Sequence, residues 1–178
     1  MNTLDAGLVR RARRSYELGR FAAATRRALP LALPISLALA GCGAPREVLA
    51  CGGALLAAVT LFLWHGQEYE AGVRPGVAAG LAPLLLPVVA RFAGHPCPAG
   101  GCLLLPAVCA LGGLAGGVLL GLLAPRPRAG RVVPFVVACS VAGLTGAVGC
   151  LLYGLVGLAV MGAGLAAGAV PLVAARRA

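Results

Sequence analysis

Charged residues in this chain fall in short clusters, and long apolar stretches separate the clusters. From Ala28 to Ala175 these stretches are long and numerous enough for about six crossings of a bilayer, since one perpendicular helix needs about 20 apolar residues. The crossings are predicted at approximately residues 28–43, 47–65, 73–92, 102–124, 132–149 and 154–175. The pattern predicts an all-α integral membrane protein, with a six-span membrane domain over residues 28–175 behind an arm over residues 1–27.

Prolines, polar residues and stretch length shape the predicted spans. The first stretch is short for a span and contains Pro30 and Pro34. A loop is expected at residues 66–74, where the chain becomes polar. Residues 132–175 carry no charge, and at about 1.5 Å per residue a single helix of that length would be about twice as long as the hydrocarbon core is thick. Two helices joined by a tight turn near residues 149–154 are therefore predicted.

The arm at the N-terminus is basic and has an apolar face. Leucines, an alanine and a tyrosine recur at every fourth position, which predicts a basic amphipathic helix lying on the cytoplasmic surface of the membrane. Such a helix would contact anionic lipid through four neighbouring arginines. They are Arg10, Arg11, Arg13 and Arg14. A protein partner stays open as the alternative for this face.

The distribution of arginine predicts the orientation of the chain. Of the 15 basic residues, all arginine, 13 lie in the arm, in alternate loops or at the C-terminus, and only Arg46 and Arg91 lie on the opposite side. The positive-inside rule then places both termini in the cytoplasm. Arginine without lysine, with much Ala, Gly, Leu and Pro, indicates a bacterial protein, and the predicted location is the inner membrane. The net charge of +10 does not indicate nucleic-acid binding, because no basic patch is interleaved with aromatic residues.

Glycines recur at every fourth position in three of the predicted spans. Small residues at this spacing let helix backbones approach closely, so a glycine-packed bundle is expected, with a homo-oligomer or another membrane protein as an open alternative for these faces. The chain also repeats short motifs at an offset of 88 residues, such as residues 76–84 and 164–172. Copies separated by an odd number of spans would be inverted, as in many transporters, which leaves a carrier of uncharged molecules open as a further alternative.

Seven cysteines are many for so small a membrane protein. Six of them are predicted at or near the outer ends of the spans, and only Cys139 lies well inside. The densest segment runs from His95 to Cys102, and its residue types fit a disulfide in an oxidising compartment, a soft metal ion such as Cu(I) or Zn(II), or free apolar thiols. The candidates for a disulfide or a metal are Cys97, Cys102, His95, Cys109, Cys42 and Cys51.

A different role is open for Cys42. The segment Leu39-Ala40-Gly41-Cys42 matches a bacterial lipobox and follows a short apolar run and a positive region. If it is processed as one, the first segment is cleaved, Cys42 carries lipid and five spans remain.

Searches for catalytic motifs in the sequence are negative. No ionisable residue lies in the middle of a predicted span, and there is no phosphate-binding loop, dinucleotide fingerprint or metalloprotease motif. The leading hypothesis is a non-enzymatic protein with a binding or assembly role, no cofactor, and an outer loop held by a disulfide. The alternative is a small transporter or sensor that uses the outer Cys and His residues for a soft metal or for thiol-disulfide exchange.

Overall fold

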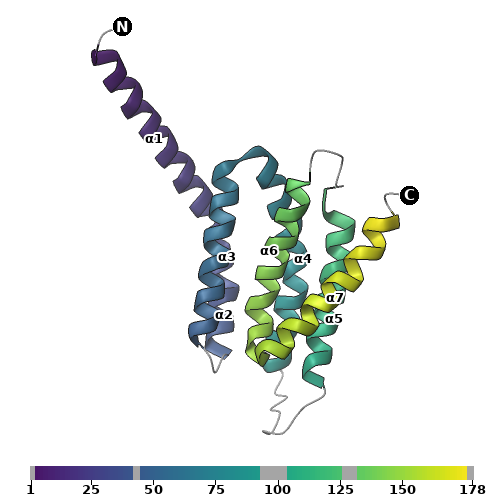
Figure 1. Ribbon diagram of the computed structural model, residues 1–178. Coiled ribbons are helices and arrows are strands. Elements are labelled where there is room, and N and C mark those ends of the chain that lie inside the picture. The colour runs from purple at the N-terminus through teal and green to yellow at the C-terminus, as the bar shows by residue number, and fades with distance from the viewer. Residues whose placement is uncertain (1–2, 42–44, 93–103, 126–131, 176–178) are drawn as a thin grey trace.

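A computed structural model describes residues 3–41, 45–92, 104–125 and 132–175 of the chain, and every regular element in these ranges is helical (Figure 1). The elements are α1 (Thr3–Ala28), η1 (Leu29–Leu31), α2 (Ala32–Gly41), α3 (Pro45–His65), α4 (Gln67–Phe92), α5 (Leu104–Leu123), α6 (Val133–Cys150), η2 (Leu151–Tyr153) and α7 (Gly154–Ala175), where η denotes a single turn of 3-10 helix. The all-α prediction is confirmed for the described residues.

Five of the described helices are long and apolar enough to cross a membrane, as expected of a multi-pass membrane protein. They cover Pro45–His65, Glu68–Ala90, Pro106–Leu123, Val133–Cys150 and Gly154–Ala175, and so correspond to the second to sixth predicted spans. The first predicted span, residues 28–43, differs from the prediction. Its described part is divided between η1 and a helix of only 10 residues, α2, which is too short to count as a crossing by itself.

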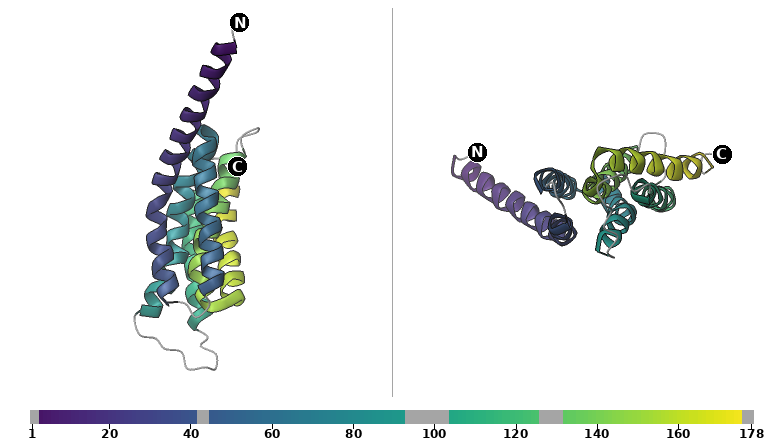
Figure 2. Two further views of the ribbon diagram at one scale, coloured as in Figure 1. Left: turned by 90° about the vertical axis from the view of Figure 1, so that its left-hand side faces the viewer. Right: turned by 90° about the horizontal axis from the view of Figure 1, so that it is seen from below.

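The division at η1 does not interrupt the packing of the N-terminal segment. Its buried residues alternate at intervals of four and three along α1, η1 and α2, which keeps them on one side of a continuous helical rod. They are Ala24, Ala28, Leu31, Ile35 and Ala38. Pro30 is the second residue of η1, and because it has no N–H, the carbonyl one turn earlier in α1 receives no hydrogen bond from it. Figure 1 and Figure 2 show that α1 meets the bundle at its C-terminal end and extends away beyond it.

The loop predicted at residues 66–74 is wrong. Gly66 alone separates α3 from α4, and it makes the turn in one residue because its φ is +83°, a left-handed conformation that favours glycine. The polar residues that follow already belong to α4, since Glu68 and Glu70 occupy its first turn, where acidic side chains stabilise a helix N-terminus. The tight turn predicted near residues 149–154 is confirmed by η2 and by Gly154, whose φ is +77°.

Two helix pairs dominate the bundle. Helix α4 packs along α6 and α5 packs along α7, while α4 and α5 join the two pairs. At many of the closest approaches the residue is glycine. A Cβ atom added to Gly76 would lie 2.7 Å from the carbonyl oxygen of Ala138, and one added to Gly164 would lie 2.6 Å from that of Ala110. These positions leave no room for a side chain unless the helices separate.

The contacts do not repeat between the two halves of the chain. At an offset of 88 residues α3 corresponds to α6 and α4 corresponds to α7, whereas α2 corresponds to residues 120–129 and not to the body of α5. Helix α5 packs extensively on α7, while α2 and α4 touch only slightly over the residues described. The described contacts therefore differ between the two halves, and the carrier of uncharged molecules stays a prediction.

The two described ends of the chain lie on the same side of the bundle. The start of α1, the turn at Gly66 and the end of α7 share one end, which we call the arm end, and η2 lies at the opposite end (Figure 1).

Candidate functional site at the arm end

The last turns of α1 are attached to α3 and α4 at the arm end. Arg20 Nη2 donates a hydrogen bond to the carbonyl oxygen of Trp64 at 2.6 Å, and Arg27 Nη1 forms an ion pair with Glu70 Oε1 at 3.1 Å. The Trp64 carbonyl belongs to the last turn of α3, where backbone acceptors lack partners within the helix and cationic groups are favoured. The Phe21 ring meets the Trp64 ring edge-on, with 6.1 Å between centroids. Charge and aromatic contacts together fix the angle at which α1 leaves the bundle.

Aromatic rings continue from this contact around the α3–α4 turn. Trp64 and His65 meet edge-on at 5.3 Å, His65 and Tyr69 meet at 5.8 Å, and Tyr69 stacks on Phe62 at 6.0 Å. Rings with an apolar body and a polar edge are favoured where a membrane meets water.

Two neighbouring grooves lie between the N-terminal rod and α3–α4. The first has a volume of about 650 Å³ and a polar lining that includes Arg20, Arg27, Glu68 and Glu70. The second has a volume of about 530 Å³ and continues towards the middle of the bundle, and the two share Arg27, Leu63 and Glu70. Its other lining residues are mostly apolar: Pro30, Leu31, Val59, Val73, Arg74, Val77, Ala78 and Leu81. Grooves of this size accommodate small amphiphilic molecules.

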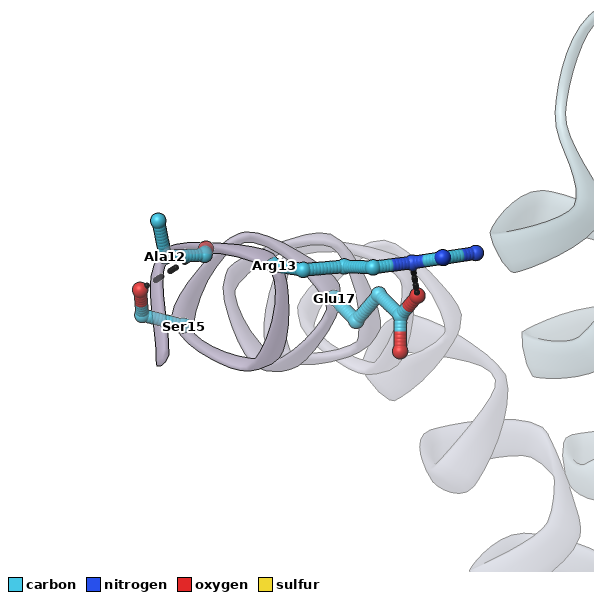
Figure 3. A network of polar contacts seen from close by, with 4 residues as sticks. All are labelled: Ala12, Arg13, Ser15 and Glu17. Atoms are coloured by element: carbon cyan, nitrogen blue, oxygen red, sulfur yellow. Dashed lines mark hydrogen bonds and ion pairs between the residues drawn. The ribbon is translucent and has the colours of Figure 1, made fainter. Parts of the chain in front are cut away.

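The first part of α1 extends beyond these contacts and is exposed from Val9 to Ala23. All four arginines predicted to contact lipid lie here. The polar contacts in Figure 3 are made within the helix itself: Arg13 Nε pairs with Glu17 Oε1 at 3.1 Å, and Ser15 Oγ donates to the Ala12 carbonyl oxygen at 3.0 Å. An exposed pair of this kind contributes little to stability. Because this part of the helix is exposed, its basic surface is accessible to a partner.

The predicted cysteine site is only partly within the described residues. Cys42, His95, Cys97 and Cys102 lie outside them. Cys51 lies on α3, half-buried, with its Sγ 3.9 Å from the Leu144 carbonyl oxygen of α6.

Cys109 has a partner that the sequence did not indicate. It is fully buried on α5, and its side chain lies 3.4 Å from that of Cys150 at the end of α6. A disulfide bond is about 2.05 Å long, and the four described cysteines, 51, 109, 139 and 150, are free thiols. No disulfide joins two of these four, and the predicted disulfides that involve Cys42, Cys97 or Cys102 fall outside the described residues and stay predictions.

A proline explains part of the position of Cys150. Pro87 has no N–H, so the Pro83 carbonyl of α4 lacks its partner within the helix. The Cys150 thiol supplies a donor to that oxygen at 3.7 Å. The hydroxyl of Tyr153 similarly donates to the Pro87 carbonyl oxygen at 3.0 Å, so the turn at η2 is attached to α4 through the same irregular stretch.

Comparisons with protein-family models, with curated proteins and with solved structures gave no match. The described residues also contain no group of three or more His, Cys, Asp or Glu side chains placed to hold a metal ion. What the arm end offers is a basic helix held at one end, an aromatic cluster and a groove that changes from polar to apolar.

Proposed function

We propose that this chain is a six-span protein of a bacterial inner membrane with a non-enzymatic role in binding or assembly, and that it binds through the arm end. The observation that carries the proposal is the arrangement of α1. Its last turns are attached by Arg20, Phe21 and Arg27, while its basic first part extends into the surroundings. A helix held in this way presents its charge at a fixed place relative to the bundle.

The N-terminal rod supplies the sixth crossing in this proposal. Residues 24–41 rise about 27 Å, close to the thickness of the hydrocarbon core. Their buried side packs on α3, where a Cβ added to Gly52 would lie 2.6 Å from Ile35 Cγ2. This packing also favours an uncleaved chain over lipidation at Cys42, because cleavage would remove the rod and leave the facing surface of α3 uncovered.

The arm end faces the cytoplasm in this proposal, and the partner of α1 is anionic lipid. The arginine distribution supports the orientation, because α1, the Gly66 turn and the end of α7 lie on one side. The proposal has three further parts that do not involve the arm end. They are a disulfide between Cys97 and Cys102 in the outer loop, close packing of the helices at glycines, and a homo-oligomer.

Hydrogen–deuterium exchange of the full chain in lipid nanodiscs tests the role of the arm. We expect the amides of residues 3–17 to exchange more slowly in discs containing anionic lipid than in zwitterionic discs. Replacing Arg10 and Arg11 by glutamine should remove most of this difference. The matched control, Arg176→Gln with Arg177→Gln, changes the net charge equally and should leave it intact. Equal exchange in both kinds of disc would refute lipid as the partner.

A further inference from the structure

Three sulfur atoms from three helices gather inside the bundle, near the end opposite the arm. Cys109 of α5, Cys150 of α6 and Met161 of α7 belong to one buried cluster, with exposed fractions of 0%, 0% and 3%. We propose that these residues form a binding site for one Cu(I) ion. The inference concerns the opposite end of the molecule and does not depend on the proposed function of α1.

Glycines bring the three helices close enough for this arrangement. A Cβ added to Gly157 of α7 would lie 2.9 Å from the Cys150 carbonyl oxygen and 3.4 Å from Cys109 Sγ, so α7 meets the cysteine pair directly at this level. Met161 lies one turn further along α7. Its Sδ is 3.1 Å from the Cβ position of Gly146, which is one turn before Cys150 on α6.

The methionine is therefore within one helical turn of the pair, a separation of about 5.4 Å along the axis. Side chains on a helix tilt towards its N-terminus, and for α7 that is the end at which the cysteines lie. The unbranched, flexible side chain of Met161 can bring its thioether to the pair by rotamer changes alone.

The donor set selects the metal. Thiolate and thioether sulfur are soft ligands that favour Cu(I), whereas a structural Zn(II) site takes four ligands from Cys, His and carboxylate groups. No third Cys, His, Asp or Glu joins the two thiols among the described residues. Three buried sulfur donors match the low coordination number of Cu(I).

Cysteine sulfur binds a metal as the thiolate, so copper binding releases protons from the site. The S–H bonds of Cys109 and Cys150 break, two S–Cu bonds form and two protons leave. Met161 contributes a lone pair, and no electron is transferred.

The experiment uses the reduced full chain in detergent, loaded anaerobically with Cu(I) in competition with a chromophoric Cu(I) chelator. We expect one copper per chain and a first coordination shell of sulfur alone in X-ray absorption. Cys109→Ala and Cys150→Ala should lose this copper, and Met161→Leu should bind it about tenfold more weakly or worse. Two matched controls, Cys139→Ala and the double variant Cys97→Ala with Cys102→Ala, should bind as tightly as the unaltered chain.

Several results would overturn the site: no competitive copper binding, oxygen or nitrogen ligands in the first shell, copper retained by Cys109→Ala, or copper lost in the Cys97 and Cys102 double variant. A loss of two hydrogens at Cys109 and Cys150 on copper loading would show a disulfide in place of the metal and equally overturn it. Met161→Leu nearly conserves volume. If a cysteine variant does not fold, the copper affinity of Met161→Leu and the X-ray absorption of the unaltered protein still test the copper site.

Discussion

Replacing Gly76 by alanine should separate α4 from α6 and destabilise the bundle. The added Cβ would lie 2.7 Å from the Ala138 carbonyl oxygen, 3.1 Å from the Ala138 Cα and 2.9 Å from the Val141 Cβ. The first two atoms belong to the backbone of α6, so no change of rotamer relieves the overlap. Inserting a methyl group into a well-packed contact costs about 1–3 kcal/mol, and here the contact is one of the two most extensive in the bundle.

Gly143 provides a matched control on α6. A Cβ there would meet nothing within 4 Å, so Gly143→Ala gains only the better helix propensity of alanine, worth up to about 1 kcal/mol. The two variants add the same methyl group inside a helix, so the gain in helix propensity cancels, and we expect their free energies of unfolding to differ by about 1–3 kcal/mol. That difference corresponds to about fivefold or more in the unfolding equilibrium constant.

Equilibrium unfolding in mixed micelles of a mild detergent and SDS measures this difference. Far-UV circular dichroism reports the helices, and fluorescence of Trp64, the one tryptophan in the chain, reports the arm end. If Gly76→Ala unfolds at the same SDS fraction as Gly143→Ala or at a higher one, the close approach of α4 and α6 is wrong, and the reasoning that glycine sets the helix spacing fails with it.

Three further measurements test separate parts of the structure. Arg27→Gln should lower the unfolding free energy by no more than about 1 kcal/mol in the same assay, because its pair with Glu70 is 65% and 37% exposed; a larger loss would show a more buried ion pair. Thr145→Val should lower stability by no more than about 1.5 kcal/mol, the net worth of one hydrogen bond, since its buried hydroxyl bonds to a carbonyl of its own helix at 2.7 Å; a larger loss would mean a partner in another helix. In a cysteine-free background, a cysteine at Glu68 should react with an impermeant thiol reagent only from the cytoplasm and one at Arg46 only from outside, and the reverse result would invert the orientation.

The long apolar stretches made most of the fold predictable. Residues 132–175 carry no charge and are too many for one crossing, which predicts two helices joined by a tight turn. The turn formed by η2 and Gly154 confirms this prediction. The loop expected at residues 66–74 failed because Glu68 and Glu70 suit the first turn of a helix as well as they suit a loop. Only the positive φ of Gly66, which the sequence does not display, distinguishes the two.

The pairing of the cysteines could not be predicted from their spacing. Cys109 lies near the start of α5 and Cys150 at the end of α6, so the span pattern places both towards the same end of the bundle. Whether they face one another depends on the rotation of each helix about its axis. That rotation is set by contacts such as Gly157 against Cys109, which belong to the assembled bundle and not to any single segment.

The single 3-10 turn η1 divides the N-terminal rod into two parts that are attached to the bundle independently. The prolines at positions 30 and 34 provide no backbone donors, so the rod lacks hydrogen bonds around this turn. On the arm side, Arg20, Phe21 and Arg27 attach α1 to α3 and α4. On the other side, Ile35 fills the space beside Gly52 of α3. A shift of one part relative to the other would therefore be absorbed in this turn while both sets of contacts are kept.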